Sequence, residues 1–131
     1  MTRVRSVNPA TGDTIAEHAL LEGAAIDAAL ERAWQGWLAW REVPLPDRAA
    51  RLRALGTELR ARASQLADTI VAEMGKPVTQ ARAEVEKCAA LCDWYAKHGP
   101  AYLADERLPV TDDGAAIVAW QPIGPVFAVM P

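Results

Sequence analysis

The stretch PIGPVFAVMP, residues 122–131, decides the fold class. Residues 126–130 read as a strand that is apolar on both faces, which is typical of the interior of a parallel sheet covered by helices. A parallel sheet needs further strands joined by crossover connections, and no further strand follows in this sequence. The sequence therefore predicts an α/β fold in which the sheet is incomplete.

A second strand is predicted just before this one. Residues 115–120, AAIVAW, form an apolar run, and a polar turn at residues 112–114 precedes it. Pro122 and Pro125 separate the two runs, because proline has no backbone N–H to donate to a sheet. We expect residues 101–122 to form a strand-bearing segment of their own.

The N-terminus predicts a β-hairpin. Val4 and Val7 precede the turn-forming run Asn-Pro-Ala-Thr-Gly-Asp at residues 8–13, and Ile15 follows it. Asn-Pro and Gly-Asp are typical of a turn between two short strands.

Helical periodicity fills the chain between the hairpin and residue 98. Apolar residues recur every three or four positions within residues 22–40, 46–74 and 77–98. Ser64 is a candidate N-cap that splits the second segment in two, and Gly75 is its C-terminal cap. The His-Gly-Pro run should end the last helix. The positions expected in the core of the last two segments are Leu52, Leu55, Leu59, Leu66, Ile70, Met74, Val78, Ala81, Val85, Cys88, Cys92 and Tyr95.

The composition is that of a globular chain without a nucleic-acid or membrane role. Its 131 residues suit one ordinary domain, and 51% are hydrophobic. The net charge is −3 with basic and acidic residues interspersed, which argues against nucleic acid as the main partner. No stretch approaches the roughly 20 apolar residues of a membrane span. The N-terminus also lacks the apolar core of a secretory signal. We expect a cytoplasmic protein.

Two cysteines, Cys88 and Cys92, share one face if their segment is helical. A structural zinc site usually takes four ligands, and His98 is the one further candidate nearby. We interpret the cysteines as small apolar residues on a packed helix face. A disulfide is disfavoured in the cytoplasm. A thiol or metal protein stays as an alternative function.

Two other sets of side chains have a structural and a functional interpretation. Trp34, Trp37 and Trp40 predict packing in a core or against a second subunit, the alternative being an aromatic platform for a ligand. The arginines between residues 48 and 62 predict a solvated helix face, the alternative being nucleic-acid binding.

The sequence shows no recognisable catalytic set and no metal-ligand set. It contains neither a G-x-G-x-x-G loop nor a G-x-S-x-G elbow. Glu84 and Glu86 are two residues apart, so on a helix they face different directions. His98 suits the end of a helix, where the dipole favours it, better than the role of a base. His18 has no visible partner. We therefore predict no catalytic residue and no metal ligand.

Several motifs in order nevertheless resemble the N-terminal part of the NAD(P)-dependent aldehyde dehydrogenase family. VNPATGD at residues 7–13 looks like the opening hairpin of that family. EMGKP at 73–77, followed by QARAEV at 80–85, resembles its signature between the middle helices. QPIGPVFAVMP at 121–131 looks like the strand pair that leads to its nucleotide-binding domain. Residues 75–106 are particularly similar to bacterial succinate-semialdehyde dehydrogenases.

The resemblance implies a division of the chain into four parts. They are an N-terminal β-hairpin segment (1–20), the helical part of the cofactor-binding domain (21–100), an oligomerisation-strand segment (101–122) and the truncated first strand of a Rossmann-like sheet (123–131). In the family this strand continues into Trp-Asn-Phe-Pro, whose asparagine helps to form an oxyanion hole. We expect the same four residues in the coding DNA after residue 131.

The resemblance also implies oxidation of an aldehyde, here succinate semialdehyde, to the acid with NAD or NADP. In the family a cysteine thiolate attacks the aldehyde, hydride passes to the nicotinamide, and water hydrolyses the thioester with a glutamate as base. The positions of that cysteine, that glutamate and the main cofactor lysine come later than residue 131. Cys88 and Cys92 do not match the motif of the nucleophile. The chain by itself is therefore predicted to be inactive.

Three positions match family contacts to the cofactor, namely Val129, Met130 and Pro131. Their contacts would be made by backbone and apolar atoms, although a plain strand core explains these residue types equally well. We expect no tight binding of NAD or NADP by this chain. The full-length enzyme is expected to be a homodimer or homotetramer with a small aldehyde substrate. The alternative is a non-catalytic helical module that binds another protein through Trp34, Trp37 and an exposed strand edge. An unpaired strand edge also predicts aggregation or instability.

Overall fold

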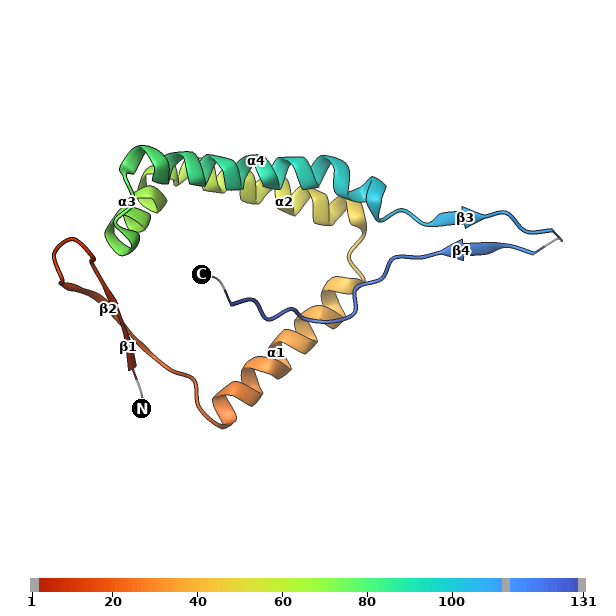
Figure 1. Cartoon of the computed structure of the whole chain (residues 1–131). Coiled ribbons are helices and arrows are strands. Elements are labelled where there is room, and N and C mark those ends of the chain that lie inside the picture. The colour runs from red at the N-terminus through yellow and green to blue at the C-terminus, as the bar shows by residue number, and fades with distance from the viewer. Residues whose placement is uncertain (1–2, 112–113, 130–131) are drawn as a thin grey trace.

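The structure, a computed structural model, describes residues 3–111 and 114–129. Within them helices and strands are mixed, which confirms the α/β class (Figure 1). The elements in order are β1 (Arg3–Val7), β2 (Thr14–Ala19), α1 (Ala24–Arg41), α2 (Leu45–Ala61), α3 (Ala63–Met74), α4 (Val78–Tyr102), β3 (Glu106–Leu108) and β4 (Ala116–Val118).

The predicted N-terminal hairpin is confirmed, because β1 and β2 pair antiparallel with Val4 opposite His18. The side-chain oxygen of Asn8 accepts a hydrogen bond from the N–H of Ala10 at 2.9 Å, a local turn that asparagine favours. The N–H of Asn8 donates to the carbonyl of Asp13 at 2.9 Å and closes the loop. Gly12 has φ 80°, a region that glycine enters without steric cost.

The hairpin contacts the end of α3. Oγ of Ser6 donates to Oε1 of Glu73 at 3.0 Å. A Cβ added at Gly75 would lie 3.1 Å from Cγ of Pro9. Gly75 also has φ 66° and is the predicted C-terminal cap of α3. The glycine therefore ends α3 with its positive φ, and its lack of a side chain lets the hairpin loop approach closely.

The predicted split of the second helical segment is confirmed, but the predicted cap is not. The break falls at Arg62, which lies between α2 and α3 and has φ −103°. Ser64 lies inside α3, and no side chain caps this helix end. The backbone N–H of Arg62 instead donates to Glu58, and its carbonyl accepts from Leu66, so the two helices share one junction residue.

Helix α4 runs past the end that the sequence predicts. It continues beyond His98 and through Pro100. Pro100 has no N–H to donate to the carbonyl of Ala96 four residues earlier. Nη2 of Arg53, from α2, donates to that carbonyl at 3.4 Å. The helix tolerates the proline because Arg53 of the neighbouring helix donates a hydrogen bond to the Ala96 carbonyl, which would otherwise lack a donor.

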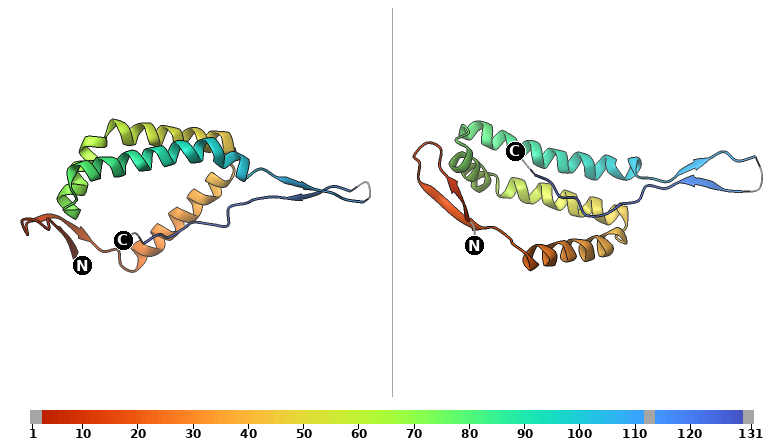
Figure 2. Two further views of the ribbon diagram at one scale, coloured as in Figure 1. Left: turned by 45° about the horizontal axis from the view of Figure 1, so that its top comes forward. Right: turned by 60° about the horizontal axis from the view of Figure 1, so that its bottom comes forward.

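Helices α2 and α4 lie side by side in every view and form the main packed unit (Figures 1 and 2). They are antiparallel, since Arg53 reaches Ala96 whereas Arg60 reaches Glu86. A Cβ added at Gly56 would lie only 3.1 Å from the carbonyl oxygen of Ala89. The two backbones therefore approach most closely around a residue without a side chain.

The buried stripe of α4 differs from the predicted one. Ala81 and Val85 are buried as predicted, and Ala89 and Ala96 are buried as well. Cys88 and Tyr95, predicted in the same stripe, are exposed. The close approach of α2 is the reason, because only small side chains fit between the two backbones. Among the other predicted core positions, Leu55, Met74 and Val78 are also exposed.

The chain exposes much more surface than a compact protein of its mass. Its accessible surface is 10419 Å², whereas a compact monomer of 14.2 kDa would expose about 6,800 Å². The buried hydrophobic residues in the described ranges are alanines and Val85. Helix α1 has no buried residue. The ribbon of β3 and β4 projects away from the helices (Figure 1). This open shape leaves several apolar faces uncovered.

The two predicted C-terminal strands have different outcomes. Residues 115–120 contain β4, so the first prediction is confirmed, although β4 is shorter and pairs with β3. Residues 125–129 carry no strand assignment. The described strands pair only as β1 with β2 and as β3 with β4, so this segment has no neighbour to hydrogen-bond with. The predicted turn residues Asp112 and Asp113 lie outside the described residues.

Candidate functional site

The predicted cofactor segment is an extended, uncovered stretch of chain. Val129 is 80% exposed, and Phe127 is 91% exposed. Met130 and Pro131, the other two predicted contact residues, lie outside the described residues. A dinucleotide is usually held by N–H donors around its pyrophosphate at a helix N-terminus. Residues 125–129 offer an apolar run instead. The described part of this segment therefore does not fit a complete dinucleotide site.

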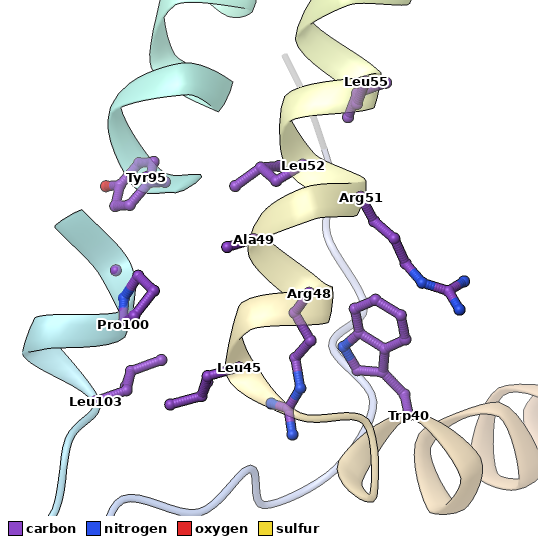
Figure 3. A pocket seen from close by; sticks show the side chains of 11 residues that line it. Trp40, Leu45, Arg48, Ala49, Arg51, Leu52, Leu55, Tyr95, Pro100 and Leu103 are labelled. Carbon is purple, nitrogen blue, oxygen red and sulfur yellow. The ribbon is translucent and has the colours of Figure 1, made fainter. Parts of the chain in front are cut away.

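An apolar groove lies between α2 and α4 (Figure 3). Its volume is about 450 Å³. Leu45 and Leu52 reach it from α2, while Pro100 and Leu103 reach it from the end of α4. Trp40, from the end of α1, stands at one side. The groove is therefore built by two stretches that are far apart in the sequence, residues 40–55 and 95–103.

This groove was not predicted from the sequence. Pro100 and Leu103 belong to it only because α4 continues past His98. One signal was available, since Leu45, Ala49 and Leu52 recur at spacings of four and three and so share a face of α2. The walls are almost wholly apolar, so the groove suits an apolar side chain better than a charged substrate.

The tryptophans do not form the single cluster that the sequence suggests. The rings of Trp34 and Trp37 lie 4.5 Å apart between centroids. Trp40 instead lies against α2, where the guanidinium carbon of Arg51 is 5.4 Å from its ring centroid. Trp34 is 45% exposed, so the described chain covers only part of this side chain.

The arginines of α2 do more than form a solvated face, which corrects that prediction. Arg48 donates to backbone carbonyls at the end of α1. Arg60 forms ion pairs with Asp93 at 2.8 Å and with Glu86 at 3.0 Å, both on α4. Hydrogen bonds from Arg60 to Asp93 and to Glu86 raise the pKa of its guanidinium above its ordinary value. Together with Arg53, these side chains join the helices.

The acidic pair on α4 behaves as predicted. Glu86 pairs with Arg60 of α2, whereas Glu84 pairs with Lys76 in front of the helix. The two carboxylates thus face different partners. Neither is arranged with the other for acid–base chemistry, which needs two groups directed at one substrate.

The two cysteines are free and differ in exposure. Cys88 is exposed, whereas Cys92 is half-buried and its Cβ would lie 3.3 Å from a Cβ added at Gly56. The packed interpretation therefore holds for Cys92 and is wrong for Cys88. In residues 3–111 and 114–129, no group of three or more His, Cys, Asp or Glu side chains is placed to hold a metal ion.

His98 lies within α4 rather than at its end. Its ring is 4.8 Å from that of Trp94 between centroids. Trp94 also lies 6.0 Å from Tyr102, so three aromatic residues form a row at i, i+4 and i+8. His98 is thus part of an aromatic row.

None of the described helices is long and apolar enough to cross a membrane.

The comparison with family models gives a match over the whole chain. The model described as the aldehyde dehydrogenase family matches residues 1–131. The NAD(P)+-dependent succinate semialdehyde dehydrogenase of Escherichia coli K12 is 45% identical over 130 residues. That match covers 99% of this chain and 28% of the relative. The chain thus spans little more than a quarter of the length of that curated relative.

Solved structures of aldehyde dehydrogenases are also similar to this chain. The succinic semialdehyde dehydrogenase of Streptococcus pyogenes, solved with NADP+, is similar with a TM-score of 0.78 and 28% identity. The match covers 88% of this chain and 25% of that one. The lactaldehyde dehydrogenase of Escherichia coli has a TM-score of 0.77 and 27% identity, covering 87% of this chain and 24% of its own. The open arrangement of helices and ribbons is therefore that of one part of a larger fold.

Proposed function

Because the chain belongs to the aldehyde dehydrogenase family, we propose that it is the N-terminal part of an enzyme that oxidises succinate semialdehyde to succinate with NAD+ or NADP+. The observation that carries this proposal is the 45% identity to an Escherichia coli succinate semialdehyde dehydrogenase over 99% of this chain.

The role we propose for these residues is to support the active site rather than to supply its reacting groups. The proposed chemistry needs a cysteine nucleophile, a general base and donors for the cofactor phosphates. The free cysteines Cys88 and Cys92 lie on α4, and neither matches the motif of the family's nucleophile. The exposed segment at residues 125–129 would become the first strand of the cofactor domain once other strands flank it.

The ribbon of β3 and β4 supports a further part of the proposal. It projects away from the helices and its strands are exposed on both faces (Figure 1). Ile117 is 55% exposed and Trp120 is 59% exposed. A two-stranded ribbon is marginal by itself in water, so we propose that it packs against another subunit of a homodimer or homotetramer.

The test is a chimera of the Escherichia coli relative in which this chain replaces the matched part. We expect the chimera to oxidise succinate semialdehyde with NAD+ or NADP+ in preference to lactaldehyde, measured by absorbance of the reduced nicotinamide. A chimera that folds, forms an oligomer and oxidises lactaldehyde faster would contradict the proposed substrate. The 131-residue chain by itself should produce no reduced nicotinamide, and turnover by it would contradict the supporting role.

A non-catalytic interaction module is the second candidate. The exposed Trp34, stacked beside the half-buried Trp37 on α1, favours it, because this helix has no buried residue. A monodisperse, stably folded 131-residue chain that complements no dehydrogenase would support the module. Failure of the chimera together with such behaviour would therefore replace the enzyme proposal.

A further inference from the structure

Helix α1 is joined to the other helices mainly at its C-terminal end. It has no buried residue, and it makes few contacts with the other helices and strands. It leaves the α2–α4 pair at a marked angle (Figures 1 and 2). Along its side, Leu30 and Trp34 line an open pocket with Pro125. The side-chain hydrogen bonds from α2 are made at the elbow, residues 41–48, where α1 ends and α2 begins.

The carbonyl groups of the elbow lack the partners that a continuing helix would give them. The guanidinium of Arg48 supplies those partners from the first turns of α2. Its Nε donates to the carbonyl of Val43 at 2.7 Å, and its Nη2 donates to the carbonyl of Arg41 at 2.9 Å. Hydrogen bonds from a charged donor are roughly twice as strong as neutral ones. A cation is also favoured at the negative end of the α1 dipole.

A ring contact adds to these hydrogen bonds. The guanidinium carbon of Arg48 lies 5.9 Å from the ring centroid of Trp40, the last tryptophan of α1 (Figure 3). One side chain of α2 thus contacts the last turn of α1 and the connecting turn. A forked, planar guanidinium can bridge two carbonyls in a fixed geometry, which a lysine ammonium does less well.

The elbow also borders the path of the chain beyond β4. Arg41, Arg48 and Leu103 line one open pocket together with Trp120 and Pro122. Residues 120–122 therefore run past the elbow. A change of angle at the elbow would move α1 and this segment relative to each other.

From these contacts we propose that Arg48 is a latch that holds α1 at a fixed angle to α2 and so keeps the elbow beside residues 120–122 in place. The latch is a conformational device of this chain and does not depend on the proposed enzyme. Arg51 is a natural control. It lies over the same Trp40 ring, at 5.4 Å, but no described hydrogen bond links it to a carbonyl of the elbow.

The test measures the angle of α1 directly in the full 131-residue chain. Spin labels at Ala28→Cys on α1 and Ala90→Cys on α4 report the distance between the helices by double electron–electron resonance, in a background with Cys88→Ser and Cys92→Ser. A second pair, Ala50→Cys and Gln80→Cys, reports the α2–α4 unit alone. All four labelled positions are exposed.

We expect a narrow distribution for the 28–90 pair in the parent chain. Arg48→Met should widen it about twofold or shift it, because both charge-assisted hydrogen bonds are lost. Arg51→Met should leave it unchanged, and the 50–80 pair should stay narrow in both variants. If Arg48→Met also disturbs the 50–80 pair, Arg48→Gln replaces it, since glutamine keeps a polar group but is too short to reach both carbonyls.

Three results would overturn the latch. One is an unchanged 28–90 distribution in the Arg48 variant with an intact 50–80 pair. Another is equal widening by Arg51→Met. The third is a parent chain in which the 28–90 distribution is already broad, because α1 would then not be held at a fixed angle.

Discussion

The α2–α4 pair and the C-terminal segment at residues 120–129 differ in the burial of their apolar side chains. In the pair, small residues such as Ala89 are buried, and backbones approach around Gly56. In the segment, Ile123 is 97% exposed and Phe127 is 91% exposed. Burial of apolar surface stabilises a fold only where a second surface covers it. An apolar pattern therefore predicts where a partner surface is needed, and the partner can be another part of the chain or another polypeptide.

The largest expected effect comes from filling the closest approach in the pair. Gly56→Leu would place a Cβ 3.1 Å from the carbonyl oxygen of Ala89 and 3.2 Å from Oδ1 of Asp93, and the rest of the side chain has no space between the helices. We expect a loss of about 2–3 kcal/mol in the free energy of unfolding, as for other overpacked cores. Urea unfolding followed by far-ultraviolet circular dichroism measures it.

Gly36→Leu on α1 is the matched control. A Cβ there meets no heavy atom within 4 Å. Since glycine is a poor helix former, this change should be neutral or should stabilise α1 by up to about 1 kcal/mol. If the two substitutions cost the same, the close approach of α2 and α4 is not what holds the pair together.

A smaller effect should follow from restoring the hydrogen bond that Pro100 removes. Pro100→Ala gives back an N–H for the carbonyl of Ala96, so we expect the free energy of unfolding to rise by about 1–2 kcal/mol, less than a full interior proline penalty because the site is near the helix end. Arg53→Met should destabilise the parent by about 0.5–1 kcal/mol, since its long hydrogen bond to Ala96 is lost.

The double variant Arg53→Met/Pro100→Ala tests whether Arg53 compensates for the proline. Once Pro100→Ala supplies a backbone donor, the loss of Arg53 should cost clearly less than in the parent. Additive effects in the cycle would show that Arg53 does not compensate for the proline. The unfolding midpoint in urea, at constant ionic strength, is the measurement for all four proteins.

The smallest effect is expected in the C-terminal segment. Val126 is 89% exposed, so Val126→Thr should change the free energy of unfolding by less than about 0.5 kcal/mol. The isosteric change Val85→Thr places a hydroxyl at a position that is 5% exposed, and it should cost about 1–3 kcal/mol. An equal cost at both sites, measured by urea unfolding, would show that the segment is already covered in solution.

Local patterns predicted most of the elements. The run at residues 8–13 predicts its turn because the asparagine side chain bonds to the nearby backbone and glycine adopts positive φ without steric cost. Gly75 predicts the end of α3 for the same local reason. The end of α4 was mispredicted because its proline is tolerated through Arg53, which lies 43 residues away in the sequence. The apolar groove was also missed, because it exists only where residues 40–55 meet residues 95–103.

The sequence by itself determined the hairpin, the helical segments and the resemblance to one family, because each depends on neighbouring residues or on motifs read in order. Only the tertiary structure decided which face of α4 is buried, why the helix passes through Pro100 and how Arg48 reaches the end of α1. These features depend on distances between helices, and an amphipathic pattern states that a face is apolar without stating which surface covers it. For the same reason the apolar run that begins at residue 126 predicts a strand, while no described strand lies beside residues 126–129 to pair with them.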